Sequence, residues 1–110
     1  MSASKDLSRL GDITQLVLDS RLQALRHASA AREKSQMQLA ALTASDAPTD
    51  LPAIAAGLVA LNYQRWADLR RAGLNAVIAR QTAEWMQAKA AASLAFGRTQ
   101  ALRGIVERLK

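Results

Sequence analysis

The stretch that decides the fold is RQTAEWMQAKAAASLAFGRTQ, residues 80–100. It contains no proline, and alanine is its commonest residue. Alanine has the highest helix propensity, so we expect a long helix here. Small side chains add little to a core, but they allow a second helix to approach closely. The stretch therefore predicts a helix that packs against a neighbour along a line of small residues.

Counting in sevens places that line on the second half of the chain. From residue 76 to residue 104, every seventh position is small: Ala76, Ala83, Ala90, Gly97 and Gly104. The intervening positions of the same seam are Ala72, Ala79 and Met86. The matching positions earlier in the chain are Leu10, Val17, Ala24, Ala28, Ala31 and Leu42. A sustained seven-residue period indicates a coiled coil. The alternative is a coincidence in an alanine-rich chain.

One polar stretch, TASDAPTDLPA at residues 43–53, interrupts the helical pattern and contains both prolines. Asp50 is placed to cap a helix, and Pro52 falls in a first turn, where its missing N–H costs nothing. We therefore expect one all-α domain: a helix over residues 4–42, a connector over 43–50 and a helix over 51–109. A short connector between long helices predicts an antiparallel coiled-coil hairpin.

A turn centred near Asp46 and Ala47 would end the first helix where the second reaches about Ala90. The remaining turns, SLAFGRTQALRGIVERLK at residues 93–110, would then have no partner within the chain. Apolar side chains among arginines are typical of a docking surface, so we expect this overhang to bind a partner. The alternative is a frayed or self-associating tail.

A second candidate contact lies near the connector, where two aromatic residues are three positions apart on one helical side. Their alternative role is to cover the seam. Trp85 stands alone further along the helix. The aromatic pair, Trp85 and the overhang together supply the predicted partner-binding residues: Tyr63, Trp66, Trp85, Leu94, Phe96, Arg98, Leu102, Arg103, Ile105 and Arg108.

Charge suggests the kind of partner. The net charge is +6, and residues 51–110 carry nine basic and three acidic side chains. A basic half suggests an acidic partner. The arginines scatter around the helix without interleaved aromatic rings to stack bases, so we do not expect specific nucleic-acid binding.

Little in the chain predicts catalysis. There is no cysteine, the one histidine, His27, has no carboxylate four residues away, and the glycines are scattered singly. We expect no catalytic, cofactor-binding or metal-binding residues, and no enzyme. The longest apolar uncharged run, residues 51–64, is too short to span a bilayer, and the start lacks an apolar export signal. We therefore expect a cytoplasmic protein, peripheral to a membrane at most.

The second helix, NYQRWADLRRAGLNAVIARQTAEWMQAKAAASLAFGRTQALRGIVER, resembles the C-terminal half of the flagellar export stalk proteins, the FliJ and YscO family. The residues that carry the resemblance are Trp85, Lys89, Gly97, Arg98 and Leu102. The resemblance implies an antiparallel coiled coil within a type III secretion apparatus. It implies that the paired terminal end inserts into the hexameric export ATPase, and that the protein contacts the export gate and substrate chaperones.

Three functional hypotheses follow. The first is a non-enzymatic export stalk that works by docking. The second is a stand-alone helical chaperone or adaptor for secreted or granule-associated proteins. The third, which the charge pattern favours least, is a basic nucleic-acid-binding protein.

Overall fold

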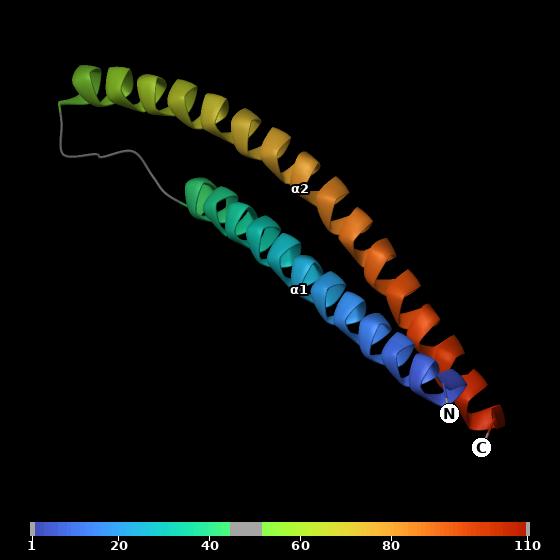
Figure 1. The fold of residues 1–110 in the computed structure, drawn as a ribbon. Helices are drawn as coiled ribbons and strands as arrows, with labels where there is room; N and C mark the ends of the chain where they lie inside the picture. Colours follow the sequence, from blue (N-terminus) through green and yellow to red (C-terminus); the bar gives the residue numbers. More distant parts are fainter. Residues whose placement is uncertain (1, 45–51, 110) are drawn as a thin grey trace. The chain divides into compact units, whose positions relative to one another are not determined.

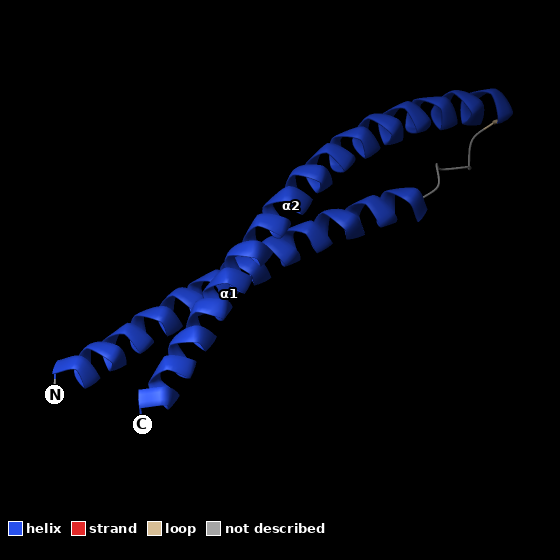
Figure 2. Ribbon diagram, turned by 90° about the vertical axis from the view of Figure 1, so that its right-hand side faces the viewer, coloured by secondary structure: helices blue, strands red, loops and turns tan. Residues whose placement is uncertain are grey.

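The computed structural model describes residues 2–44 and 52–109, and within them it contains two helices and no strand (Figure 2). Helix α1 spans Ser2–Ala44, with 43 residues, and α2 spans Ala53–Leu109, with 57 residues. The two helices form an antiparallel coiled-coil hairpin, as the sequence predicted (Figure 1).

The helix ends lie close to the predicted positions. Helix α1 is two residues longer than expected at each end, so Thr43 belongs to α1 and not to the connector. Pro52 precedes α2, and its carbonyl accepts a hydrogen bond of 2.7 Å from the Ala56 N–H. This bond closes the first turn of α2, so Pro52 stands one residue before the helix, which begins two residues later than predicted. The predicted cap, Asp50, lies outside the described residues.

Contacts divide the chain into two compact units. The terminal unit joins Met1–Ala30 to Ala83–Lys110, and the connector unit is Ala31–Thr82. In the terminal unit the start of α1 and the end of α2 lie side by side (Figure 1). The Arg103 guanidinium donates a hydrogen bond of 3.5 Å to Gln15 Oε1 across this pair. Leu18, Ala95 and Leu102 are buried in it.

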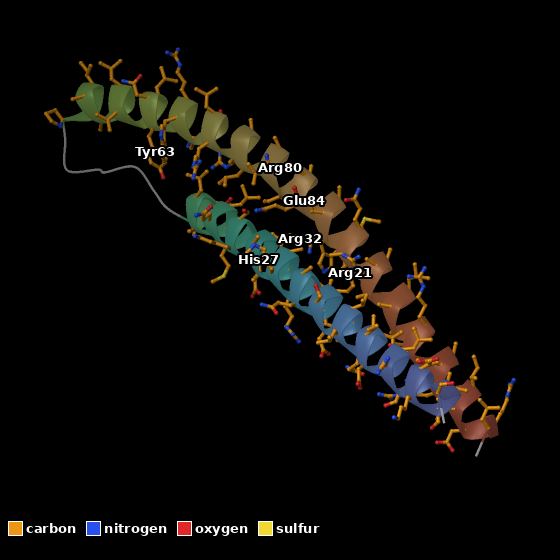
Figure 3. The ribbon with its side chains drawn as sticks, viewed as in Figure 1. Arg21, His27, Arg32, Tyr63, Arg80 and Glu84 are labelled. Atoms are coloured by element: carbon orange, nitrogen blue, oxygen red, sulfur yellow. The ribbon has the colours of Figure 1, made fainter. Side chains whose placement is uncertain are left out.

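The connector unit has its own small core. Leu42 of α1 clusters with Ala67 and Leu74 of α2, and Leu39 and Tyr63 pack against the cluster. Nearby, Arg32 points toward α2 (Figure 3), and its Nε–H donates to Thr82 Oγ1 at 2.9 Å.

The predicted seam is wrong in its position. All five residues of the small-residue line (Ala76, Ala83, Ala90, Gly97 and Gly104) are exposed. A methyl group added to Gly97 or Gly104 would meet nothing within 4 Å. The other predicted seam positions that are exposed are Leu10, Val17, Ala24, Ala72, Ala79 and Met86. Of the α1 positions, Ala28 and Ala31 are half-buried and Leu42 is buried, as predicted.

The positions of α2 that face α1 follow the predicted three- and four-residue steps but in another column. They are Ala67, Arg71, Leu74, Ile78, Gln81, Trp85, Ala88, Ala92, Ala95, Thr99, Leu102 and Val106, all buried or half-buried. Small residues therefore do line the contact, at Ala88, Ala92 and Ala95. They alternate with bulky residues, which have more apolar surface to remove from water.

The predicted C-terminal overhang is also wrong. In the terminal unit, a methyl group on Gly11 would lie 3.9 Å from Leu102 Cδ2, so the end of α2 packs on the beginning of α1. In the connector unit, the α2 segment is about twice as long as the α1 segment, which ends at Ala44. The packed side chains, and not the centre of the connector, set the register. The longer α2 segment therefore extends past α1 at its own N-terminal end.

Candidate functional site

The structure distributes the predicted partner-binding residues over both units. Tyr63 and Trp66 belong to the connector unit, and the other eight belong to the terminal unit. Their exposure separates them into two classes, those on the surface and those covered by the neighbouring helix.

The exposed class in the terminal unit contains apolar and basic side chains. Leu94, Phe96 and Ile105 are 57%, 54% and 47% exposed. The predicted basic residues Arg98, Arg103 and Arg108 are also exposed. Leu102 belongs to the covered class, because it is buried against α1, so its side chain contributes to the hairpin and is not presented to a partner.

The aromatic residues have partners within the chain. Tyr63 is half-buried against the Leu42 cluster. This position agrees with the alternative role given above for the aromatic pair, which is to cover the contact between the helices. The Tyr63 ring lies 5.7 Å from that of Trp66 at an angle of 43°, and Trp66 is 54% exposed. Trp85 is half-buried on the seam, and Lys89 Nζ lies 5.2 Å from its ring centroid, within the range of a cation–π interaction.

A groove opens in the terminal unit between the first turns of α1 and the last turns of α2. Its lining is mostly apolar or small and encloses about 580 Å³: Ala3, Ser4, Leu7, Ser8, Gly11, Val106 and Leu109. A second hollow of about 370 Å³ shares Gly11 and Val106 with it and adds charged groups at Asp12, Arg103 and Glu107. The absence of a side chain at Gly11 leaves room at the point where the two hollows meet.

Sequence reasoning missed a set of apolar residues at the start of α2. Ile54, Leu58, Leu61 and Leu69 are 84%, 60%, 49% and 76% exposed. The absence of charge from residue 51 to residue 64 could have identified the first three, whereas Leu69 lies beyond that run. Placing the overhang at the wrong end of α2 concealed their exposure.

Side chains that could hold a metal ion do not gather in the parts of the chain that the structure describes. Residues 2–44 and 52–109 contain no group of three or more histidine, aspartate or glutamate side chains able to hold a metal ion. His27 is exposed on α1 (Figure 3). The buried hydroxyl of Thr99 donates to the carbonyl of Ala95, and that of Ser35 donates to the carbonyl of Ala31.

No described helix combines the length and the apolar character that a membrane span requires. Comparison of the chain with protein-family models, with curated proteins and with solved structures found no match.

Proposed function

We propose that this chain is a non-enzymatic helical-hairpin adaptor that works by docking to protein partners in the cytoplasm. In its specific form, it is the stalk of a flagellar or type III export apparatus and docks to the export ATPase ring and the export gate. The observation that carries this proposal is the paired terminal unit. There Phe96, Ile105 and three arginines are exposed on the part of α2 that packs with the start of α1.

The resemblance to the export stalk proteins implies that the paired end enters the ring, and a paired end fits that role better than a single free helix does. Charge supports the same surface. The last turns of α2 carry Arg98, Arg103 and Arg108 against one acidic residue, Glu107. The basic last turns of α2 are attracted to an acidic lining, and apolar residues among the arginines can supply the anchors.

An adaptor of this kind needs no reactive group of its own. It would change ATP turnover only by binding one state of the ring more tightly than another. The groove at Gly11 and Val106 offers a place for an apolar side chain of the partner. Docking would thus combine the fit of an apolar side chain in the groove with the attraction between the surrounding arginines and acidic groups of the partner.

The test uses the purified chain and the purified hexameric export ATPase of the same organism. We expect the two to elute together from a size-exclusion column at moderate salt. Arg98→Glu with Arg108→Glu should abolish this co-elution. Arg65→Glu with Arg70→Glu makes the same change of charge in the connector unit and should leave co-elution intact. Absence of co-elution for the unmodified chain would refute the stalk assignment. Equal loss in both variants would reduce the interaction to general charge attraction.

A further inference from the structure

The beginning of α2 presents an apolar face that α1 does not cover. This connector face consists of Ile54, Leu58, Leu61 and Leu69, which are 49% to 84% exposed. Steps of four, three and eight residues place them on one side of a helix. Trp66, which is 54% exposed, lies at its edge.

The connector face points away from the helix pair. Ala67, which is fully buried against the Leu42 cluster, follows Leu58 by nine residues. Nine residues make about two and a half turns, so the two positions lie on opposite sides of α2. The face therefore stays accessible when the connector unit is fully packed.

The hairpin alone buries few large side chains. Among the described residues, the buried large apolar side chains are Leu18, Leu42, Leu74 and Leu102, whereas fifteen large apolar side chains are exposed. A chain with so thin a core commonly gains further stability from association. The connector face is the part of this surface with the most exposed side chains, Ile54 and Leu69.

Charge indicates which partner suits the face. Residues 53–64 carry no charged side chain, whereas residues 65–109 carry eight basic and three acidic ones. Two copies of a chain with net charge +6 repel each other wherever their basic surfaces meet. The uncharged start of α2 is the segment on which a second copy can pack without that repulsion.

We propose that the connector face binds the same face of a second copy, with the two α2 helices antiparallel about a two-fold axis. Parallel pairing would set Arg65 against its own counterpart, which is unfavourable. Antiparallel pairing sets it toward the uncharged start of the other helix instead. The axis then falls between positions 61 and 62, so that Leu61 lies beside its own counterpart and Ile54 of one copy lies opposite Leu69 of the other.

Arg65 is compatible with this contact although it lies on the same side of α2. It is exposed, and in the antiparallel register it lies opposite Leu58 of the second copy. The aliphatic part of an arginine can cover a leucine while its guanidinium stays in water at the rim. The proposal concerns the connector unit and is independent of the docking proposed for the terminal unit.

The first experiment measures the mass of the full chain by sedimentation velocity between roughly 1 and 200 µM, a range that covers weak and moderate dimers. We expect the mass to double with concentration. Leu58→Glu with Leu61→Glu should raise the dimer dissociation constant by more than about 100-fold, because four carboxylates would meet in an apolar contact. Met86→Glu with Leu94→Glu changes two comparably exposed residues elsewhere on α2 and should leave the constant unchanged.

Circular dichroism should show that both double variants keep their helical content. A chain that stays monomeric over the whole range would overturn the proposal and leave the face to a different partner. A dimer that survives Leu58→Glu with Leu61→Glu would overturn it as well, because the contact would then lie elsewhere.

The second experiment tests orientation by disulfide cross-linking, which is clean because the chain has no cysteine. Leu61→Cys should cross-link to itself. Ile54→Cys and Leu69→Cys should cross-link when the two variants are mixed, and each should remain uncross-linked alone. Self-cross-linking of both Ile54→Cys and Leu69→Cys would show a parallel pair and contradict the proposed symmetry.

Discussion

At the scale of single residues, the two glycines of the small-residue line are informative. Gly97 and Gly104 lie inside α2 without a positive φ angle, and a methyl group on either would meet no atom within 4 Å. Among the described residues, neither a turn nor a close helix contact requires them. They therefore carry the ordinary cost of glycine in a helix, about 0.5–1 kcal/mol relative to alanine.

We expect Gly97→Ala to raise the free energy of unfolding by about 0.5–1 kcal/mol, because alanine reduces the conformational freedom of the unfolded chain. Urea denaturation followed by circular dichroism measures the change. Ala90→Gly, one heptad earlier on the same exposed line, is the reciprocal control and should lower stability by a similar amount. A loss of stability in Gly97→Ala would indicate that another backbone does approach this line.

At the scale of the helices, the seven-residue period correctly predicted a helix pair. It did not identify which line of residues on α2 contacts α1. Helix α2 contains two columns with a seven-residue period, one through Ala76 and Gly97 and one through Leu74 and Leu102. The first has small residues only. The second, taken with the positions four residues on from it, includes Leu74, Ile78, Trp85, Leu102 and Val106. These side chains have apolar surface to bury, at about 25 cal/mol per Å², and this side of α2 therefore packs against α1. The presence of bulky apolar side chains therefore identifies the side of α2 that packs on α1, and a regular line of small residues does not.

Two substitutions on α2 separate these columns experimentally. Ala95 is 5% exposed on the seam, so Ala95→Leu should overpack the contact and lower the free energy of unfolding by about 1–3 kcal/mol. Ala90 is exposed on the opposite line, so Ala90→Leu should change it by less than about 0.5 kcal/mol. Thermal and urea denaturation of the two variants measure the difference. A larger loss in Ala90→Leu would return the seam to the small-residue line.

The candidate site was only partly predictable for a related reason. Phe96, Ile105 and the arginines are exposed, but the predicted reason, an overhang without a partner, is wrong, and their role in binding stays a prediction. The burial of Leu102 and the exposure of Ile54 depend on the register between the helices. Register is fixed by contacts between the helices, such as the approach of the Leu102 side chain to Gly11, and no single helix contains that information.

At the scale of the whole molecule, the surplus of basic side chains makes two kinds of binding distinguishable. Binding that depends on charge alone weakens as the salt concentration rises, because the release of counterions then contributes less favourable entropy. Binding that depends on buried apolar surface persists or strengthens as salt rises. The chain has features for both kinds of binding: its net charge of +6 favours the first, and the apolar connector face favours the second.

We therefore expect DNA retention and self-association to respond to salt in opposite ways. Fluorescence polarisation with a random-sequence duplex should show binding at low salt that falls by at least about 100-fold between roughly 50 and 200 mM NaCl. Sedimentation at the same salt concentrations should show a dimer that is retained, because the screening of like charges removes the residual repulsion between two basic chains. We expect no discrimination between sequences, because the exposed arginines scattered on α2 are not arranged to contact base edges. Duplex binding that survives this range of salt and discriminates between sequences would instead favour a nucleic-acid-binding protein.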